Sequence, residues 1–210
     1  MSNKNKLIPG LLGQFVRARR SALGLSQDSL SRISGVSRRV ITRLERETDD
    51  PSLIADPRLP TLDQLARALL LDVPQLVSGN VASNIAYCGQ ESQIRVAGNF
   101  ARLRKEFGFS QERLSEASGR FRTYVHRIEV LAFTPCLSDV ESIANQMKST
   151  AVDVLAPISD REYRLRLARR DRAAAPGNLH FTSSGSFVSW PPEQLDMASS
   201  ADQRPNALDE

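Results

Sequence analysis

The sequence predicts an all-α protein with two tandem five-helix domains, followed by a basic helix and a largely disordered C-terminal tail. Three observations predict this class: a segment repeated at a fixed interval, apolar residues at helical spacing, and glycines and prolines at the ends of the helical segments. The repeat is the most informative, because a fixed internal period indicates one structural unit used twice. Each unit holds roughly 65 residues, near the lower limit for a domain that folds alone.

The repeat aligns residues 20–53 with the residues 84 positions later, without a gap. Its identical pairs include Arg20/Arg104, Gly24/Gly108, Ser26/Ser110, Gln27/Gln111, Leu30/Leu114, Gly35/Gly119, Arg38/Arg122, Arg43/Arg127, Glu45/Glu129 and Pro51/Pro135. After Pro51 the offset falls from 84 to 78, so the first unit carries about six extra residues near positions 54–59. We expect this insertion to lie in a loop, where extra residues are tolerated.

Apolar spacing, capping residues and helix breakers predict the same order of helices in both units. In the first unit we expect helices at about 11–23, 26–34, 37–46, 61–70 and 74–77. In the second unit we expect them at about 94–107, 110–118, 122–130, 138–147 and 152–155. Gly35 and Gly119 permit the sharp turn between the second and third helices. The core should include Leu30, Ile41, Leu44, Leu114, Val125 and Ile128.

These elements divide the chain into four parts. The parts are a first domain at 1–77, a linker at 78–91, a second domain at 92–156, and a basic helix with a largely disordered tail at 157–210. Within the first domain we expect residues 1–9 to form a loose leader. The basic helix is expected at 159–173, and the Ser-, Pro-, Gly- and Asp-rich composition after Pro176 predicts disorder.

The charge of the chain favours a nucleic-acid partner. The 210 residues carry a formal net charge of +4, and the sequence pI is about 9.4. Arginines crowd into four stretches, at residues 17–20, 38–46, 120–127 and 161–172. Clustered arginine is the electrostatic footprint of a nucleic-acid binder, although each cluster taken alone also fits a solvated helix face.

The sequence argues against several other classes of protein. Its two cysteines, Cys88 and Cys136, lack ligand-like spacing, so we expect reduced thiols in a cytoplasmic protein. No signal-peptide pattern is present, and the longest apolar run, at 68–71, is far too short to span a membrane. His126 and His180 are its only histidines, and no nucleophile pattern, zinc spacing or phosphate-binding glycine loop occurs. We therefore expect no catalysis, no cofactor and no metal.

Two short helices joined by a tight turn form a helix-turn-helix, whose second helix enters the DNA major groove while the first braces it across the backbone. Arginine can donate two bonds to guanine, threonine can contact a thymine methyl, and a helix N-terminus favours phosphate. We therefore expect DNA contacts from the start of the second helix and from the outward face of the third. The residues are Gln27, Ser37, Arg38, Arg39, Thr42 and Arg43 in the first unit and Gln111, Arg122, Thr123, Tyr124, His126 and Arg127 in the second.

Both units resemble the lambda-repressor/Cro-like helix-turn-helix family, also called the xenobiotic-response-element type. The matching residues of the first unit are Arg20, Gly24, Ser26, Gln27, Leu30, Gly35, Val36, Ser37, Arg38, Ile41, Arg43, Leu44, Glu45 and Pro51. Those of the second are Arg104, Gly108, Ser110, Gln111, Leu114, Gly119, Arg122, Thr123, Tyr124, Val125, Arg127, Ile128, Glu129 and Pro135. The resemblance implies five-helix domains, operator DNA as ligand and control of transcription, often repression, without catalysis. It also implies two scaffold pairs, Arg20–Glu45 and Arg104–Glu129.

The second unit departs from this pattern in two places. Arg120 stands where the first unit has the apolar turn residue Val36, and Phe121 replaces the capping serine, so we expect Phe121 to fill the turn. After the third helix, the polar residues 46–49 of the first unit become the apolar residues Val130 to Phe133. An exposed apolar loop indicates protein contact, so we expect this unit also to support a homodimer or to pack on the first unit.

These observations predict a sequence-specific DNA-binding transcriptional regulator that represses by binding a double-stranded operator. A linker of about 14 residues reaches at most about 46 Å. That exceeds the roughly 34–36 Å between half-sites one helical turn apart, so one chain could read an asymmetric operator. Two alternatives stay open. One is an antitoxin that also binds a toxin through the basic helix or the C-terminal tail, and the other is a modulator of another regulator that has lost DNA binding.

Overall fold

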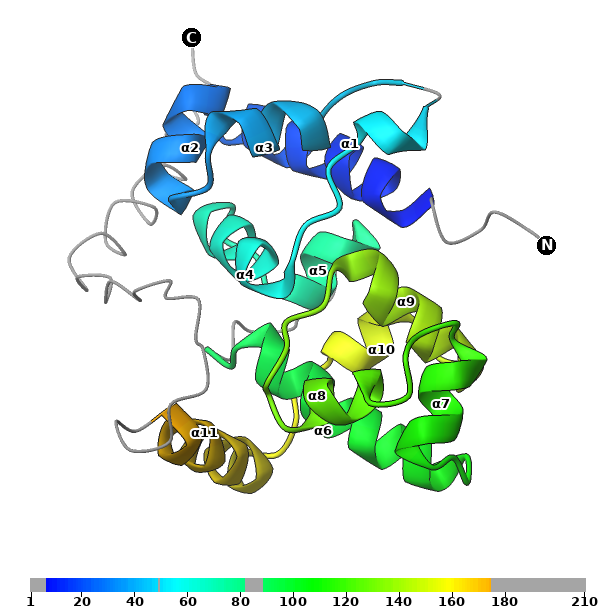
Figure 1. Cartoon of the computed structure of the whole chain (residues 1–210). Coiled ribbons are helices and arrows are strands. Elements are labelled where there is room, and N and C mark those ends of the chain that lie inside the picture. Colours follow the sequence, from blue (N-terminus) through cyan, green and yellow to red (C-terminus); the bar gives the residue numbers. More distant parts are fainter. Residues whose placement is uncertain (1–6, 49, 82–88, 175–210) are drawn as a thin grey trace, which may run out of the picture. The chain divides into compact units, whose positions relative to one another are not determined.

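In the computed structural model of the chain, residues 7–48, 50–81 and 89–174 are described. Within them the chain forms eleven α-helices, one 3₁₀ turn at Pro51–Leu53 and a single isolated β-bridge (Figure 1). The first repeat contains α1 (Leu7–Ala22), α2 (Gln27–Ser34), α3 (Arg38–Leu44), α4 (Leu59–Ala68) and α5 (Val73–Ser78). The second contains α6 (Ser92–Glu106), α7 (Gln111–Ala117), α8 (Tyr124–Glu129), α9 (Leu137–Gln146) and α10 (Ala151–Leu155), and α11 (Asp160–Ala174) follows. The all-α prediction is confirmed for these residues, whereas the expected disordered tail lies outside them.

Capping groups explain where several helices begin. Ser26 Oγ accepts a hydrogen bond from Ser29 N at 3.0 Å, and Ser110 caps α7 in the same way. Each cap satisfies an N–H group of the first turn that has no partner within the helix. Helix α1 differs from the prediction, because it begins at Leu7 inside the expected leader. Pro9 is tolerated there, since the N–H that it lacks falls in the first turn of the helix.

Two glycines of the first repeat are required by the course of the backbone. Gly35 follows α2 in the left-handed conformation, with φ of 73°, and allows the turn into α3. Gly13 lies where α1 crosses the end of α3, and a Cβ there would stand 1.8 Å from the Leu44 carbonyl oxygen. The absence of a side chain at Gly13 therefore allows α1 to pack closely against the end of α3.

The hydrophobic core runs continuously through both repeats. The six residues expected in the core are all at most 1% exposed, namely Leu30, Ile41, Leu44, Leu114, Val125 and Ile128. Burial of one such side chain contributes roughly 1.5–3 kcal/mol. Both repeats lie in one compact unit that extends to Ala173, so the segment at 78–91 joins packed repeats.

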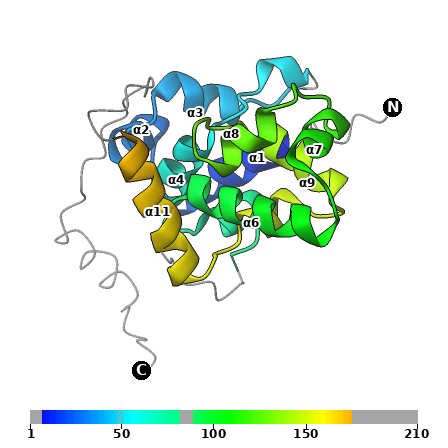
Figure 2. The ribbon, with the colours of Figure 1, turned by 60° about the horizontal axis from the view of Figure 1, so that its bottom comes forward.

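The repeats pack against each other through equivalent segments. At the offset of 78, Arg58 is the counterpart of Cys136, and these two residues pair in an antiparallel β-bridge. Beside the bridge, Leu137 N donates to the Pro57 carbonyl oxygen at 3.0 Å. Helix α5 contacts its counterpart α10, and the contact of α4 with α6 is matched by that of α1 with α9 (Figure 1, Figure 2). Contacts between like segments mark a two-fold interface, which here forms within one chain.

A buried ion pair breaks this symmetry. Arg95 of α6 is fully buried and pairs with Asp72 at the start of α5, with Nη2–Oδ1 at 2.8 Å and Nη1–Oδ2 at 2.9 Å. Arg95 Nη1 also donates to the Leu155 carbonyl oxygen of α10 at 3.2 Å. The counterparts of the two charged residues are Leu11 and Thr150, which cannot form such a pair. The Arg95 guanidinium thus links α6 to both helices at the centre of the interface.

Asp63 of α4 also lies at the boundary between the repeats. Its carboxylate accepts hydrogen bonds from Ser92 Oγ at 2.6 Å and from Ser92 N at 3.2 Å. Burial raises the pKa of Asp63 from 3.8 to about 6, although the two bonds from Ser92 act in the opposite direction. The folded protein therefore holds a proton near pH 5 that the unfolded chain releases.

We expect Arg95→Leu to lower the free energy of unfolding by about 3–5 kcal/mol, because it leaves the Asp72 carboxylate buried without its cation. Urea denaturation followed by circular dichroism measures the loss. Arg102→Leu is the control on the same helix, since both members of the Arg102–Glu106 pair are 51% exposed. Exposed pairs contribute only about 0–1 kcal/mol. Equal losses in the two variants would contradict the role given to the buried pair.

We expect Asp63 to make the protein more stable at pH 5 than at pH 7. The stabilisation is complete below the unfolded pKa of 3.8 and is lost as the pH rises through the folded pKa of about 6. Urea denaturation at pH 5, 6 and 7 measures this change. Asp63→Asn removes the titrating group, so the rise in stability towards pH 5 should shrink in that variant. An identical pH profile for both proteins would show that Asp63 is not its source.

Candidate nucleic-acid interface

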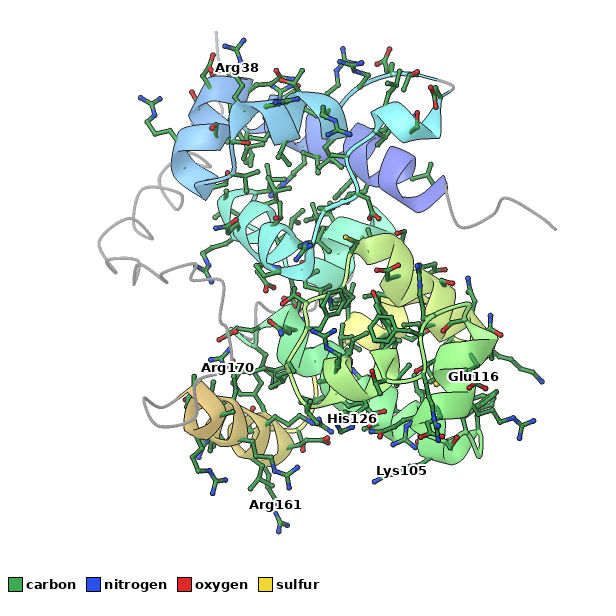
Figure 3. The ribbon with its side chains drawn as sticks, viewed as in Figure 1. Arg38, Lys105, Glu116, His126, Arg161 and Arg170 are labelled. Carbon is green, nitrogen blue, oxygen red and sulfur yellow. The ribbon has the colours of Figure 1, made fainter. Side chains whose placement is uncertain are left out.

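The outward face of α3 carries a dense group of cationic side chains. Arg38, Arg39, Thr42, Arg43 and Arg46 are all exposed and line one shallow hollow. Figure 3 shows Arg38 projecting away from the ribbon. Within the described residues, Arg39, Arg43 and Arg46 form no ion pair, so their guanidinium groups are free to meet an anion.

A nearly buried carboxylate holds α3 in place. Glu45, just after α3, accepts bonds from Arg20 Nε and Nη2, each at 2.8 Å, and its side chain is 2% exposed. Arg20 Nη1 donates to the Leu25 carbonyl oxygen at 2.7 Å, and Gln27 Nε2 donates to Glu45 at 2.9 Å. The bond to Glu45 raises the pKa of Arg20. Because a bidentate guanidinium–carboxylate pair has a fixed geometry, α1, α2 and α3 keep one relative orientation.

The second repeat has the same bonds at the offset of 84. Arg104 Nε and Nη2 donate to the two Glu129 oxygens at 2.7 and 3.1 Å, and Arg104 Nη1 donates to the Phe109 carbonyl oxygen at 3.0 Å. Gln111 Nε2 donates to Glu129 at 2.6 Å. The bond to Glu129 likewise raises the pKa of Arg104. The scaffold pairing that the family resemblance implies is therefore confirmed in both repeats.

The other end of each glutamine amide faces the third helix. Gln27 Oε1 accepts a hydrogen bond from Thr42 Oγ1 at 3.1 Å. In the second repeat, Gln111 Oε1 lies 3.2 Å from Nδ1 of His126, the counterpart of Thr42. The two side-chain amides expected to meet phosphate are thus engaged within the protein, where they orient Thr42 and His126. A phosphate contact at these positions therefore falls to backbone N–H groups.

Each repeat also has one exposed ion pair between its second and third helices. Arg38 Nη1 lies 3.2 Å from Asp28 Oδ1, and Arg122 Nη2 lies 2.7 Å from Glu112 Oε2. All four side chains are more than half exposed, and the bond to Glu112 raises the pKa of Arg122. Exposed pairs contribute little to stability, so a phosphate can replace the carboxylate at either arginine.

The third helices of the two repeats differ in their first turn. Ser37 is extended, with φ of −60° and ψ of 140°, and α3 begins directly after it at Arg38. In the second repeat, Arg122 and Thr123 form a turn, and α8 begins only at Tyr124. Thr123 has φ of −95° and ψ of 7°. Arg122 and Thr123 are therefore exposed at the entrance to α8 and do not lie on the helix itself.

Of the twelve expected contact residues, Tyr124 is the one that is buried. It is 5% exposed, and its hydroxyl donates to Asp139 Oδ2 at 2.5 Å. Burial, followed by this bond to a carboxylate, raises the pKa of Tyr124. Its ring packs against Phe121 and Phe133, with centroids 5.1 Å apart in both contacts. Tyr124 belongs to the core of the second repeat, and we leave it out of the interface.

Phe121 does not fill the turn as expected, because it is 53% exposed. At the position of Val36, Arg120 pairs with Asp139, and its guanidinium lies 5.7 Å from the centroid of the Tyr124 ring. The Tyr124 ring is buried beside this ion pair, and Phe121 lies at the surface.

Arg127 is held between two aromatic rings. Its Cζ lies 5.9 Å from the centroid of Phe121 and 5.5 Å from that of Phe133. Phe133 belongs to the apolar loop after α8 and packs against residues of its own repeat. Val130 of the same loop is 49% exposed. Arg127 remains exposed, but the rings restrict its directions more than those of its counterpart Arg43.

The sequence interpretation missed two contributors to this surface. Arg46 lines the same hollow as the expected arginines, and its spacing of three residues from Arg43 could have identified it. Asp28, the partner of Arg38, stands where the second repeat also has an acidic residue. The acidic residue at this position of both repeats could have been recognised in the sequence. Its ion pair with Arg38 could not, because that pair depends on how α2 and α3 cross.

None of the helices in the described ranges is both long and apolar enough to cross a lipid bilayer. In the same ranges, no group of three or more His, Cys, Asp and Glu side chains could hold a metal ion. The thiol of Cys136 is partly buried, and burial raises its pKa.

Comparison with known proteins agrees with this geometry. Residues 16–76 match a family model described as Helix-turn-helix, of the lambda-repressor/Cro-like type, which is a family of DNA-binding regulators. The match begins within α1 and ends within α5, so it covers most of the first repeat. No curated protein and no solved structure matches the chain. The match does not extend to residues 92–155, whose similarity to the matched segment is the alignment at the offset of 84.

We expect Tyr124→Phe to lower the free energy of unfolding by roughly 1.5–3 kcal/mol, because it removes a hydrogen bond to a carboxylate. DNA affinity should stay unchanged, since the side chain is buried. Urea denaturation measures the first quantity and fluorescence anisotropy the second. The exposed residue His126 provides the matched control, because His126→Ala should alter affinity and not stability. A Tyr124→Phe protein of full stability but weak DNA binding would contradict this assignment.

Proposed function

We propose that the protein is a sequence-specific DNA-binding regulator of transcription, acting as a repressor, whose two repeats each read one half of an operator. One observation carries the proposal: equivalent segments of the repeats meet at the Arg58–Cys136 bridge and at the α5–α10 contact. A dimeric reader matches the two-fold symmetry of a DNA site by this kind of relation between its subunits. The chain contains two readers in an arrangement that ordinarily needs two chains.

The packed interface between the repeats, and not the length of the linker, sets the distance between α3 and α8. Leu76 of α5 and Val154 of α10 are both 0% exposed. The buried Arg95–Asp72 pair adds a directional contact in the same region. Close-packed interiors resist deformation, so the two third helices are presented at one spacing. This stiffness supports an operator with a fixed number of base pairs between its half-sites.

The two half-sites should differ, because the two readers differ. Helix α3 presents Arg39 and Arg43, with Thr42 on the same face. Two-bond contacts to guanine and a contact to a thymine methyl are the matching base features. Helix α8 presents His126 and a more restricted Arg127. We therefore propose an asymmetric operator in which the α3 half-site contributes more of the affinity.

The observation that supports DNA, and not another ligand, is the uncompensated charge on α3 and on Arg46, which follows it. Arg39, Arg43 and Arg46 are exposed on one face with no carboxylate bonded to them in the described part of the chain. Clustered cations of this kind release counterions from a duplex, so binding should weaken steeply as salt rises. The repressor assignment rests on the family resemblance.

We expect selection from a random DNA pool to return a bipartite, asymmetric motif with constant central spacing. Arg39→Ala/Arg43→Ala should erase one half of the motif and His126→Ala/Arg127→Ala the other, because each lost two-bond contact costs about 1–3 kcal/mol. Inserting about 5 bp between the half-sites should abolish simultaneous contact, since half a helical turn places them on opposite faces. Sequencing of the selected pools and anisotropy titrations provide the measurements.

Arg102→Ala/Lys105→Ala on α6 is the charge-matched control, and it should return the original motif. A single perfect palindrome would contradict reading by one chain and would indicate a homodimer that uses one repeat. Failure to select any DNA, together with tight capture of another regulator, would favour the modulator alternative. Co-purification with a small toxin encoded next to it would favour the antitoxin alternative.

A further inference from the structure

We infer that the outward face of α11 is an additional DNA-binding surface that contacts the phosphate backbone beside the half-site read by α8. This inference rests on the proposed function and extends it to a helix outside both repeats. Because α11 follows the second repeat, its contact would lie on that side of the operator.

Helix α11 is fixed to the second repeat along its inner side. Glu91 N donates to the Tyr163 hydroxyl at 3.3 Å, and Arg170 Nη1 lies 2.5 Å from Glu91 Oε2. The Gln90 side chain holds the segment before α11, because it donates to the Ile158 carbonyl oxygen at 2.8 Å and accepts from Ile158 N at 3.1 Å. Movement of α11 away from α6 would break the two bonds to Glu91.

One contact places α11 next to the second reader. Arg166 Nη1 donates to the carbonyl oxygen of Glu129, the last residue of α8, at 3.2 Å. A cation is favourable there because the last carbonyl groups of a helix carry partial negative charge. Arg166 Nε is itself held by Glu162 at 3.0 Å. A duplex seated on α8 would therefore have α11 beside it.

The outward face of α11 is a stripe of arginines. Arg161, Arg164, Arg169 and Arg172 are exposed, and their spacing places them on one side of the helix. Figure 3 shows Arg161 pointing away from the ribbon and Arg170 on the opposite side of α11. In the ranges that the structure describes, Arg161, Arg164 and Arg169 form no ion pair.

The three carboxylates of α11 are bonded to groups other than this stripe, so they do not neutralise it. Their contacts are Asp160–Gln90 at 3.4 Å, Glu162–Arg166 at 3.0 Å and Asp171–Arg170 at 3.4 Å. No carboxylate of α11 is therefore paired with the outward arginines.

This stripe fits a polyanion better than a protein groove or a lipid surface. Helices that bind grooves or membranes present several apolar anchors, whereas Leu165 is the one large apolar side chain on this face, at 54% exposure. From Arg161 to Arg172 the stripe extends about 16 Å, at about 1.5 Å per residue. Over that length a DNA duplex carries about ten phosphate charges.

The test uses the full chain and the selected operator at two lengths, either ending at the α8 half-site or extended beyond it by about 10 bp, one helical turn. Arg161→Ala/Arg164→Ala should weaken binding to the extended duplex about tenfold near 0.1 M salt. It should also reduce the slope of log affinity against log salt by about 1.8, since each phosphate contact contributes about 0.9. The affinity for the shorter duplex should not change, and selection should return the same motif.

Arg102→Ala/Lys105→Ala removes the same charge from α6 and should leave both the affinity for the extended duplex and the salt slope unchanged. If the two variants behave alike while the original chain binds its operator, the inference about α11 is overturned and the proposed function stands. If the original chain binds no duplex at all, the proposed function itself fails. If polyglutamate binding depends on the stripe and DNA binding does not, the surface serves an acidic protein instead.

Discussion

The contact between equivalent segments of the two repeats is the constraint on which the other features depend. Arg58 pairs with its own counterpart, Cys136, and α5 packs on α10, so a two-fold relation is imposed on everything attached to these segments. Within each repeat, a carboxylate at the end of the third helix is bonded by an arginine of the first helix, as in the Arg20–Glu45 and Arg104–Glu129 pairs. The contact between the repeats fixes how the repeats are placed, and the arginine–glutamate pair fixes the third helix within each repeat. Together the two contacts set the directions in which the outward arginines point.

The interior of each repeat could be predicted because its signals are local. Helical spacing, capping serines and turn glycines lie within a few residues of the elements that they define, and the predicted core residues are buried. The contact between the repeats had no such signal. Arg58 lies in a proline-rich segment that reads as a loop, and Arg95 reads as a surface cation. Its burial depends on Asp72, which is 23 residues away and belongs to the other repeat.

The arrangement of the candidate interface could be predicted where the second repeat follows the residue pattern of the first. It could be predicted less well where the residues of the second repeat differ from that pattern. The offset of 84 correctly pairs Thr42 with His126, and each bonds to the same glutamine position. Tyr124 was expected on the outward face, but α8 begins later than the pattern indicates, and the Tyr124 ring faces inward towards Asp139. Whether an aromatic side chain near a helix start faces the groove or the core depends on that start, and a single sequence locates helix ends poorly.

Under the function proposed above, the connection of both DNA-reading units in one polypeptide removes an association equilibrium. When expression falls, the concentration of a dimeric repressor falls as the square of the concentration of its subunits. Two halves joined in one chain remain together at any dilution. Under the proposed function, occupancy of the operator would then follow a simple hyperbola in the concentration of the chain. The covalent connection would also leave each half free to diverge without disturbing a partner encoded by the same gene.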